Sequence, residues 1–175
     1  MKINPQIYRE YDIRGVVDKD LTPEIVRRLS QGFGTPMRKL GRGNLVVGRD
    51  RRLSSASYGE RVIEGLMSAG CNVVEIGVCP TPGYYFSLFH LDKDGGMMVT
   101  GSHNPPEFNG FKVSVGKSTI FGKEIQNLGR LIEKGEFSTG KGNLSKSGII
   151  KPYQDYIKQN IKLEKKIRVV IDAGN

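Results

Sequence analysis

The sequence has no long hydrophobic run and only two cysteines among its 175 residues. No segment approaches the ~20 consecutive apolar residues of a membrane span, so we expect no membrane partner. The first five residues lack the apolar block of a signal peptide, which favours a cytoplasmic protein. Cys71 and Cys79 make no disulfide framework, and no further Cys or His cluster completes a metal site. We therefore expect two reduced thiols in the core.

Long runs of like charge are also absent, although the net charge is +9. A positive charge of this size suggests nucleic acid as a partner. However, the lysines and arginines are spread along the chain, in runs no longer than Arg51-Arg52 or Lys165-Lys166. No aromatic residues alternate with a basic stripe. We therefore expect no nucleic-acid partner, and small phosphorylated molecules fit the charge at least as well.

Glycine is the residue in excess, with 23 where average usage of ~7% would give about a dozen. Many of these glycines fall between predicted strands and helices, where their conformational freedom suits loops that a ligand approaches. With 37% hydrophobic residues the chain can bury a core, and its length suits one ordinary domain.

The hydrophobic periodicity predicts alternating strands and helices. Pro36 is expected to end or kink the first helix near Gly34. Residues 111–115 return after a loop too short for a parallel crossover, so the predicted fold class is α/β, with a mixed sheet sandwiched by helices. Strands are predicted at 44–50, 72–78, 97–99 and 111–115, and helices from Thr22, from Ser54 or Ser55 to Ala69, and at 82–89 and 123–134.

The last quarter of the sequence predicts a change of domain. Residues 135–148 are rich in Gly, Ser and Lys and are predicted to form an exposed connection, followed by a short helix at 152–161. Residues 167–171 are predicted to be a new buried strand, and the sequence stops before any element that would bury it. We therefore predict one complete domain at 1–148, then a linker helix and the truncated start of a second α/β domain at 149–175.

The chemistry concentrates in one loop, at residues 100–112. Two prolines and an Asn-Gly pair make this loop rigid, and it presents the hydroxyl of Ser102, the imidazole of His103 and the ammonium of Lys112. A serine-hydrolase elbow would need glycine at positions 100 and 104, and a P-loop would need glycine at position 111, so both motifs fail. His103 directly follows Ser102, so its ring is not expected to act as an in-line base. Either serine-centred phosphate chemistry or a well-ordered turn remains.

Two other charged segments have open interpretations. Asp12 and Arg14 are either a surface ion pair on an edge strand, or place an arginine at the mouth of an anion site. Residues 49–52, with sequence Arg-Asp-Arg-Arg, lie at the carboxyl end of a predicted buried strand. They form either the ligand end of an α/β sheet or a solvated loop.

Four motifs occur in order along nearly the whole chain: Tyr-Asp-Ile-Arg-Gly at 11–15, Gly-Arg-Asp at 48–50, Pro-Thr-Pro at 80–82, and Thr-Gly-Ser-His-Asn-Pro at 100–105, continuing to Asn-Gly-Phe-Lys at 109–112. In these motifs the chain resembles the N-terminal portion of the α-D-phosphohexomutases, of the phosphomannomutase/phosphoglucomutase type. The resemblance implies four domains around a cleft, with domain I and the first strand of domain II present here. It implies that Ser102 is a phosphoserine. The enzyme would interconvert the 1- and 6-phosphates of mannose or glucose through a hexose bisphosphate.

By the same resemblance, Lys112 and Arg14 offset the phosphoserine charge of about −1.5 to −2. Lys112 is also a candidate acid/base at the sugar hydroxyl, if its neighbours favour the neutral form. His103 and Asn104 would contact the phosphate and order the loop, and Tyr11 would support Arg14.

The resemblance implies Mg²⁺ as cofactor, bound by the phosphate on Ser102 and by an acidic loop of domain II that is absent from this chain. The implied partners are hexose phosphate, hexose bisphosphate and domains II–IV of the same polypeptide. We therefore expect the chain to be an incomplete and inactive fragment of an intramolecular phosphotransferase. The alternative is a non-catalytic phosphosugar-binding or scaffold module of the same fold.

Overall fold

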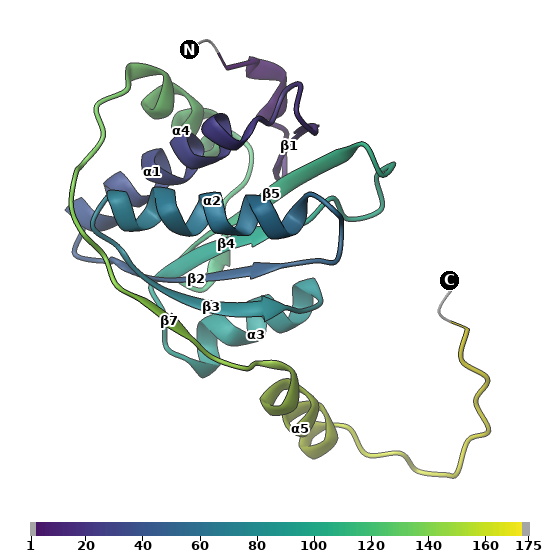
Figure 1. The fold of residues 1–175 in the computed structure, drawn as a ribbon. Coiled ribbons are helices and arrows are strands. Elements are labelled where there is room, and N and C mark those ends of the chain that lie inside the picture. The colour runs from purple at the N-terminus through teal and green to yellow at the C-terminus, as the bar shows by residue number, and fades with distance from the viewer. Residues whose placement is uncertain (1–2, 173–175) are drawn as a thin grey trace.

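The computed structural model describes residues 3–172, which are organised around one mixed β-sheet (Figure 1). The strands are β1 Ile13–Val16, β2 Asn44–Arg49, β3 Asn72–Val78, β4 Gly95–Val99, β5 Phe108–Val115, β6 Ser118–Thr119 and β7 Leu144–Lys146. The helices are the short 3-10 helix η1 Pro5–Ile7, α1 Pro23–Lys39, α2 Ser55–Ser68, α3 Thr81–His90, α4 Lys123–Lys134 and α5 Ile150–Asn160. The predicted strand at 72–78 and helix at 123–134 are confirmed to the residue.

The strand order is β1-β5-β4-β2-β3-β7, with β6 paired to β5. Strands β4, β2, β3 and β7 are parallel to one another, whereas β5 is antiparallel to both β4 and β1. A parallel return would need a long crossover, and the connection from β4 to β5 is short. The mixed sheet is therefore confirmed. The short connection lies at the carboxyl ends of β4 and β2, the edge at which open α/β sheets bind ligands.

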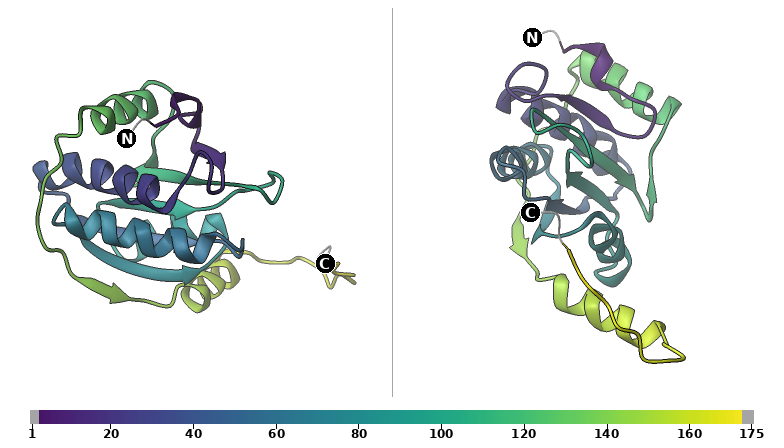
Figure 2. Two further views of the ribbon diagram at one scale, coloured as in Figure 1. Left: turned by 45° about the horizontal axis from the view of Figure 1, so that its top comes forward. Right: turned by 90° about the vertical axis from the view of Figure 1, so that its right-hand side faces the viewer.

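Helices cover both faces of the sheet, as predicted (Figure 2). The larger core cluster joins α1, α2 and α4 to the sheet and includes Phe33 and Phe111, whereas the smaller cluster joins α3 to the sheet and includes Tyr84 and Met98. Because neighbouring side chains on a strand face opposite ways, β4 supplies both clusters. Both cysteines are free and buried, and burial raises the pKa of each thiol to about 11.

Helix α1 continues through Pro36 to Lys39, so the predicted end near Gly34 is wrong. The start is as predicted, because Thr22 accepts a hydrogen bond from the backbone of Ile25 at 3.3 Å. Pro36 lies in the last turn, where its missing N–H removes one helical hydrogen bond. The next residue, Met37, is fully buried, and burial of this face offsets that loss.

Ser54 occupies the N-cap position of α2, as predicted, but its side chain makes no capping hydrogen bond. Instead, the side-chain amide of Asn109 in β5 donates to the hydroxyls of Ser54 and Ser55, at 2.8 and 3.0 Å. The start of α2 is therefore fastened to β5 beside the loop that carries Ser102.

The C-terminal region departs from the sequence prediction at residues 144–146 and at residues 167–171. Residues 144–146 of the predicted connection form β7, which pairs with β3. Helix α5 confirms the short helix predicted at 152–161 and packs on α3, with the ring of Phe86 5.5 and 5.2 Å from the rings of Tyr153 and Tyr156.

Residues 167–171 form no strand and are exposed, so the predicted buried strand is wrong for this chain. A strand needs a neighbour for its backbone hydrogen bonds, and none lies beside this segment within residues 3–172.

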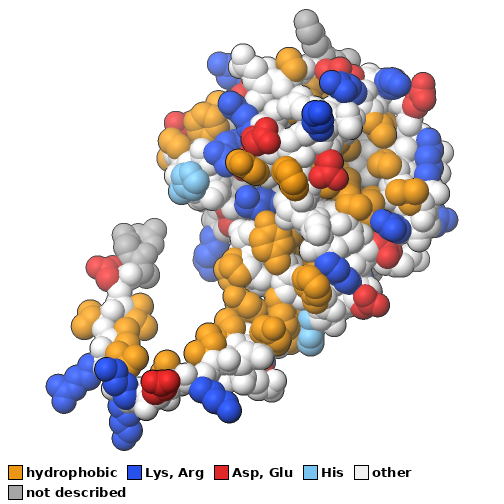
Figure 3. Space-filling model, turned by 180° about the vertical axis from the view of Figure 1, so that it is seen from behind, with side chains coloured by type: hydrophobic (Ala, Val, Ile, Leu, Met, Phe, Trp, Pro, Cys, Tyr) orange, Lys and Arg blue, Asp and Glu red, His pale blue; other side chains and the backbone are white. Residues whose placement is uncertain are grey.

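Hydrophobic side chains continue from the main body along α5 and residues 167–171 (Figure 3). Within residues 3–172, no helix is both long and apolar enough to cross a membrane.

Candidate active site

The serine loop, residues 100–107, connects β4 to β5 in a tight turn that several hydrogen bonds hold. The backbone N–H of Ser102 donates to Oγ1 of Thr100 at 2.9 Å, and the side-chain amide of Asn104 donates to the carbonyl of Gly101 at 2.7 Å. Ser102 has φ 53°, in the left-handed region. This conformation costs a residue other than glycine roughly 1–2 kcal/mol. A strained serine inside a fixed turn indicates a functional position.

His103 lies closer to the serine hydroxyl than the sequence suggested. Its Nδ1 is 3.2 Å from Oγ of Ser102, whereas we expected the ring of an adjacent residue not to serve that hydroxyl. The left-handed backbone at Ser102 turns the two neighbouring side chains to the same side. Both side chains are exposed.

Arg14 on β1 reaches the serine loop from the neighbouring strand. One end of its guanidinium pairs with Asp12 at 2.5 Å, and the other donates to Oδ1 of Asn104 at 2.9 Å. Asp12 is only 8% exposed, so the pair is not the surface ion pair that the sequence left open. The buried carboxylate therefore aims Arg14 at the loop. Tyr11 is 69% exposed and lines a hollow of about 440 Å³ together with Arg14 and Asn104.

Lys112 lies on β5 and is half-buried. Gly110 pairs with Arg14 in the strand register, and Lys112 follows Gly110 by two residues. The period of a strand therefore places Lys112 and Arg14 on the same face of the sheet, as diagonal neighbours. No hydrogen bond or ion pair joins Lys112 to the serine loop within residues 3–172. The structure thus brings Ser102 against His103, and Arg14 against Asn104.

A second arginine, Arg52, was not predicted as a site residue and contacts the serine loop more extensively than Arg14. It follows β2, donates to backbone carbonyls of the loop and pairs with Asp50 at 3.7 Å. The segment after β2 therefore supports the serine loop, and its residues Asp50, Arg51 and Arg52 also line a cavity beside that loop. Parallel pairing of β2 and β4 could have revealed this, since it places both following loops at one edge.

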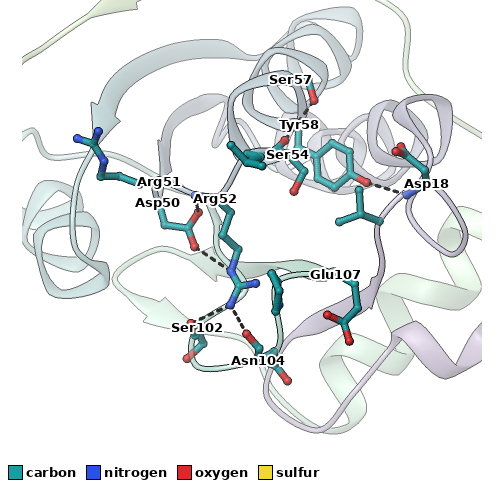
Figure 4. A pocket seen from close by; sticks show the side chains of 13 residues that line it. Asp18, Asp50, Arg51, Arg52, Ser54, Ser57, Tyr58, Ser102, Asn104 and Glu107 are labelled. Carbon is teal, nitrogen blue, oxygen red and sulfur yellow. Dashed lines mark hydrogen bonds and ion pairs between the residues drawn. The ribbon is translucent and has the colours of Figure 1, made fainter. Parts of the chain in front are cut away.

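A cavity of about 820 Å³ opens on the side of the serine loop that faces α2 (Figure 4). Ser102 and Glu107 line one wall, and Ser57 and Tyr58 of α2 line the other. The Tyr58 hydroxyl donates to the carbonyl of Leu21, and burial raises the pKa of this tyrosine. Arg14 and Tyr11 do not line this cavity, so the loop separates two hollows, with Asn104 lining both.

The charges around Ser102 suit an anionic group better than a bare metal ion. Among residues 3–172, no cluster of three or more His, Cys, Asp or Glu side chains is placed to hold a metal. The hydroxyl instead has an imidazole beside it, and Asn104 connects the same loop to a guanidinium. A serine hydroxyl in these surroundings can accept and release a phosphoryl group, because phosphoryl transfer needs positioning and charge neutralisation more than a further covalent partner.

The chain matches proteins of known family over most of its length. Residues 5–139 match the family model "Phosphoglucomutase/phosphomannomutase, alpha/beta/alpha domain I". The chain is 39% identical over 169 residues to a phosphomannomutase/phosphoglucomutase of Pseudomonas aeruginosa, covering 97% of this chain and 36% of that protein. It is 36% identical over 175 residues to a phosphoglucomutase of Neisseria gonorrhoeae, covering 99% of this chain and 38% of that protein.

Solved structures agree with the sequence comparison. A phosphoglucomutase/phosphomannomutase family protein from Burkholderia thailandensis superimposes with a TM-score of 0.88 at 37% identity, covering 94% of this chain and 38% of that chain. A phosphomannomutase, described as putative, from Thermus thermophilus gives 0.78 at 28% identity, covering 87% and 35%. The chain spans just over a third of the length of these relatives. It belongs to the phosphoglucomutase/phosphomannomutase family and carries that family's α/β/α domain I.

Proposed function

We propose that this chain is the N-terminal part of a phosphohexomutase that interconverts the 1- and 6-phosphates of mannose or glucose. Ser102 is proposed to carry the phosphoryl group, and a hexose bisphosphate is the intermediate. The observation that carries the proposal is the conformation of Ser102, exposed and left-handed in a fixed turn that Arg14 contacts through Asn104. The names of the relatives supply the reaction class.

The proposed reaction has two phosphoryl transfers. In the first, the bond from phosphorus to Oγ of Ser102 breaks and a bond from phosphorus to a sugar oxygen forms. The sugar hydroxyl loses its proton, and Oγ of Ser102 takes up a proton. The bisphosphate then reorients. In the second transfer, its other phosphoryl group moves to Oγ of Ser102, whose hydroxyl loses its proton, and the sugar oxygen that is released takes up a proton. The net result moves phosphate between O1 and O6 of the hexose.

The remaining site residues take supporting roles in this proposal. Lys112 exchanges the proton with the sugar hydroxyl, and its place on the same sheet face as Arg14 supports this role. Arg14 and Lys112 offset the phosphoserine charge, which is about −1.5 to −2. His103 and Asn104 contact the phosphate, and Tyr11 supports Arg14 where both line one hollow.

Mg²⁺ fits this chain only in part. When bound, it would neutralise charge on the transferring phosphoryl group. The described residues form no metal site of their own, so a phosphate on Ser102 would be the one ligand that this chain supplies. The other ligands would come from domain II.

The domain organisation is proposed on the same basis. Residues 1–148 form domain I, and residues 149–175 form the linker helix and the start of domain II. The rest of the polypeptide, domains II–IV, would complete the site. The 175-residue chain is therefore proposed to be inactive alone, as part of a cytoplasmic enzyme of carbohydrate metabolism.

The test compares glucose 1-phosphate conversion by the 175-residue chain and by the full-length polypeptide, with Mg²⁺ and a bisphosphate activator. We expect turnover only from the full-length polypeptide, and none from its Ser102→Ala variant. Turnover by the short chain near that of the long one would overturn the proposed incompleteness. Full-length protein that binds hexose phosphate without turning it over would favour the non-catalytic binding module instead.

A further inference from the structure

The backbone carbonyls of the serine loop converge on one guanidinium, that of Arg52 (Figure 4). Its Nη1 donates to the carbonyls of Pro105 at 2.8 Å and Phe108 at 3.0 Å. Its Nη2 donates to the carbonyls of Ser102 at 3.2 Å and Asn104 at 2.5 Å. One planar cation therefore fixes carbonyls from both ends of the loop, an arrangement for which the rigid fork of arginine is suited.

Asp50 holds the other side of the same arrangement. Its carboxylate accepts the backbone N–H of Gly101 at 3.2 Å and the hydroxyl of Ser55 at 2.5 Å. It also accepts the backbone N–H of Arg52 at 3.0 Å. Since Ser55 begins α2, the carboxylate fastens the serine loop to a long helix as well as to the segment after β2.

The side chain of Arg52 occupies the space that a side chain at position 101 would need. A Cβ at position 101 would lie 2.7 Å from Cδ of Arg52 and closer still to its Nε and Cζ. Gly101 is not among the residues with positive φ, so its backbone would accept alanine. The guanidinium would therefore have to move if a residue with a Cβ stood immediately before Ser102.

These contacts act on the backbone of Ser102 and leave its hydroxyl free. A hydrogen bond from a charged donor stabilises a fold by at least as much as one residue's left-handed conformation costs. The bonds from Arg52 can therefore offset the strain without any phosphate present. The Ser102 carbonyl is held inward, and its Oγ stays exposed beside His103.

We propose that Asp50 and Arg52 are positioning residues that hold Ser102 in its transfer-ready conformation before it is phosphorylated. We call the hydrogen bonds from Arg52 and Asp50 to the serine loop the clamp. The catalytic consequence of the clamp rests on the proposed function, but the clamp itself is a property of this chain. In this proposal Arg52 fixes the conformation of the loop by donating hydrogen bonds to its backbone carbonyls, and other groups neutralise the charge of the phosphate.

The first test is a double-mutant cycle in the stability of the 175-residue chain, which has its own core. Alanine at position 101 would displace Arg52 and lose the same bonds as Arg52→Ala. We therefore expect each single variant to lower the folding equilibrium constant by about tenfold or more, and the double variant to be no worse than either. Arg42→Ala, an exposed arginine before β2, is the matched control and should be neutral. Additive losses in the double variant would overturn the clamp.

The second test uses turnover of the full-length polypeptide. Arg52→Lys keeps the charge but loses the fork, so we expect kcat to fall about a hundredfold while KM for hexose phosphate stays nearly constant. Guanidinium ion should partly restore kcat of Arg52→Ala and leave the kcat of Arg42→Ala unchanged. An unchanged kcat, or a rise in KM alone, would contradict the positioning role. If the unaltered polypeptide shows no mutase turnover, the proposed function fails, whereas the stability cycle still decides the clamp.

Discussion

The left-handed backbone at Ser102 predicts an unusual order of stability between two variants. Ser102→Gly and Ser102→Ala both remove the hydroxyl and its contact with His103, so their difference isolates the backbone. Alanine at φ 53° would carry a strain of roughly 1–2 kcal/mol. Glycine avoids this strain but loses about 0.5–1 kcal/mol through its greater freedom in the unfolded chain. We therefore expect the glycine variant to be more stable by about 0.5–1 kcal/mol.

Urea unfolding of the 175-residue chain, followed by circular dichroism, measures this difference as a shift of midpoint at constant slope. Ser57 provides the matched control, because it is exposed in α2 and has a helical backbone. There the order should reverse, with alanine more stable than glycine by about 0.5–1 kcal/mol. An alanine variant at position 102 that equals or exceeds the glycine variant would refute the reasoning.

Three further predictions concern the core. Gly65→Ala should destabilise the chain by about 1–3 kcal/mol, because the new Cβ would overlap the backbone of α1. Gly59→Ala on the same helix meets only an ordinary contact and should stabilise the chain by about 0.5–1 kcal/mol. The urea midpoints of the two variants would measure both changes. Burial raises the pKa of Tyr8 to about 12, so the folded state favours the neutral phenol. That stabilisation is present below pH 10 and is lost as the pH rises to about 12, and Tyr8→Phe should remove about 1 kcal/mol of the alkaline loss between pH 8 and pH 11. Cys71 and Cys79 should react with a thiol reagent at pH 8 only after unfolding, and rapid labelling of the folded chain would contradict their burial.

The sequence predicted those elements whose signals are local. Helix α4 and strand β3 have clear periodicity and clear ends, and the short return after β4 required the antiparallel strand. The predicted helix end near Gly34 was wrong because α1 continues to Lys39 and buries Met37, and burial is not a local property. Strand β7 was missed because it is short, exposed and defined only by its pairing with β3.

The candidate site was predictable to a similar limit. Ser102, His103 and Asn104 are neighbours in sequence, so one motif predicts them together. Arg14 lies 90 residues from Asn104 in sequence, yet contacts it, and only the family resemblance connected the two. The sequence marked residues 49–52 as a possible ligand end, but it did not predict that Arg52 supports the serine loop, because backbone carbonyls leave no signature in the side-chain pattern.

The central claim is that Ser102 carries the phosphoryl group. Mass spectrometry of the full-length polypeptide after incubation with hexose bisphosphate tests it most directly. We predict one phosphate on the peptide that contains Ser102, its loss on addition of hexose monophosphate, and neither phosphate nor turnover in Ser102→Ala. Turnover that persists in Ser102→Ala, or in wild-type protein whose Ser102 never carries phosphate, would contradict the account.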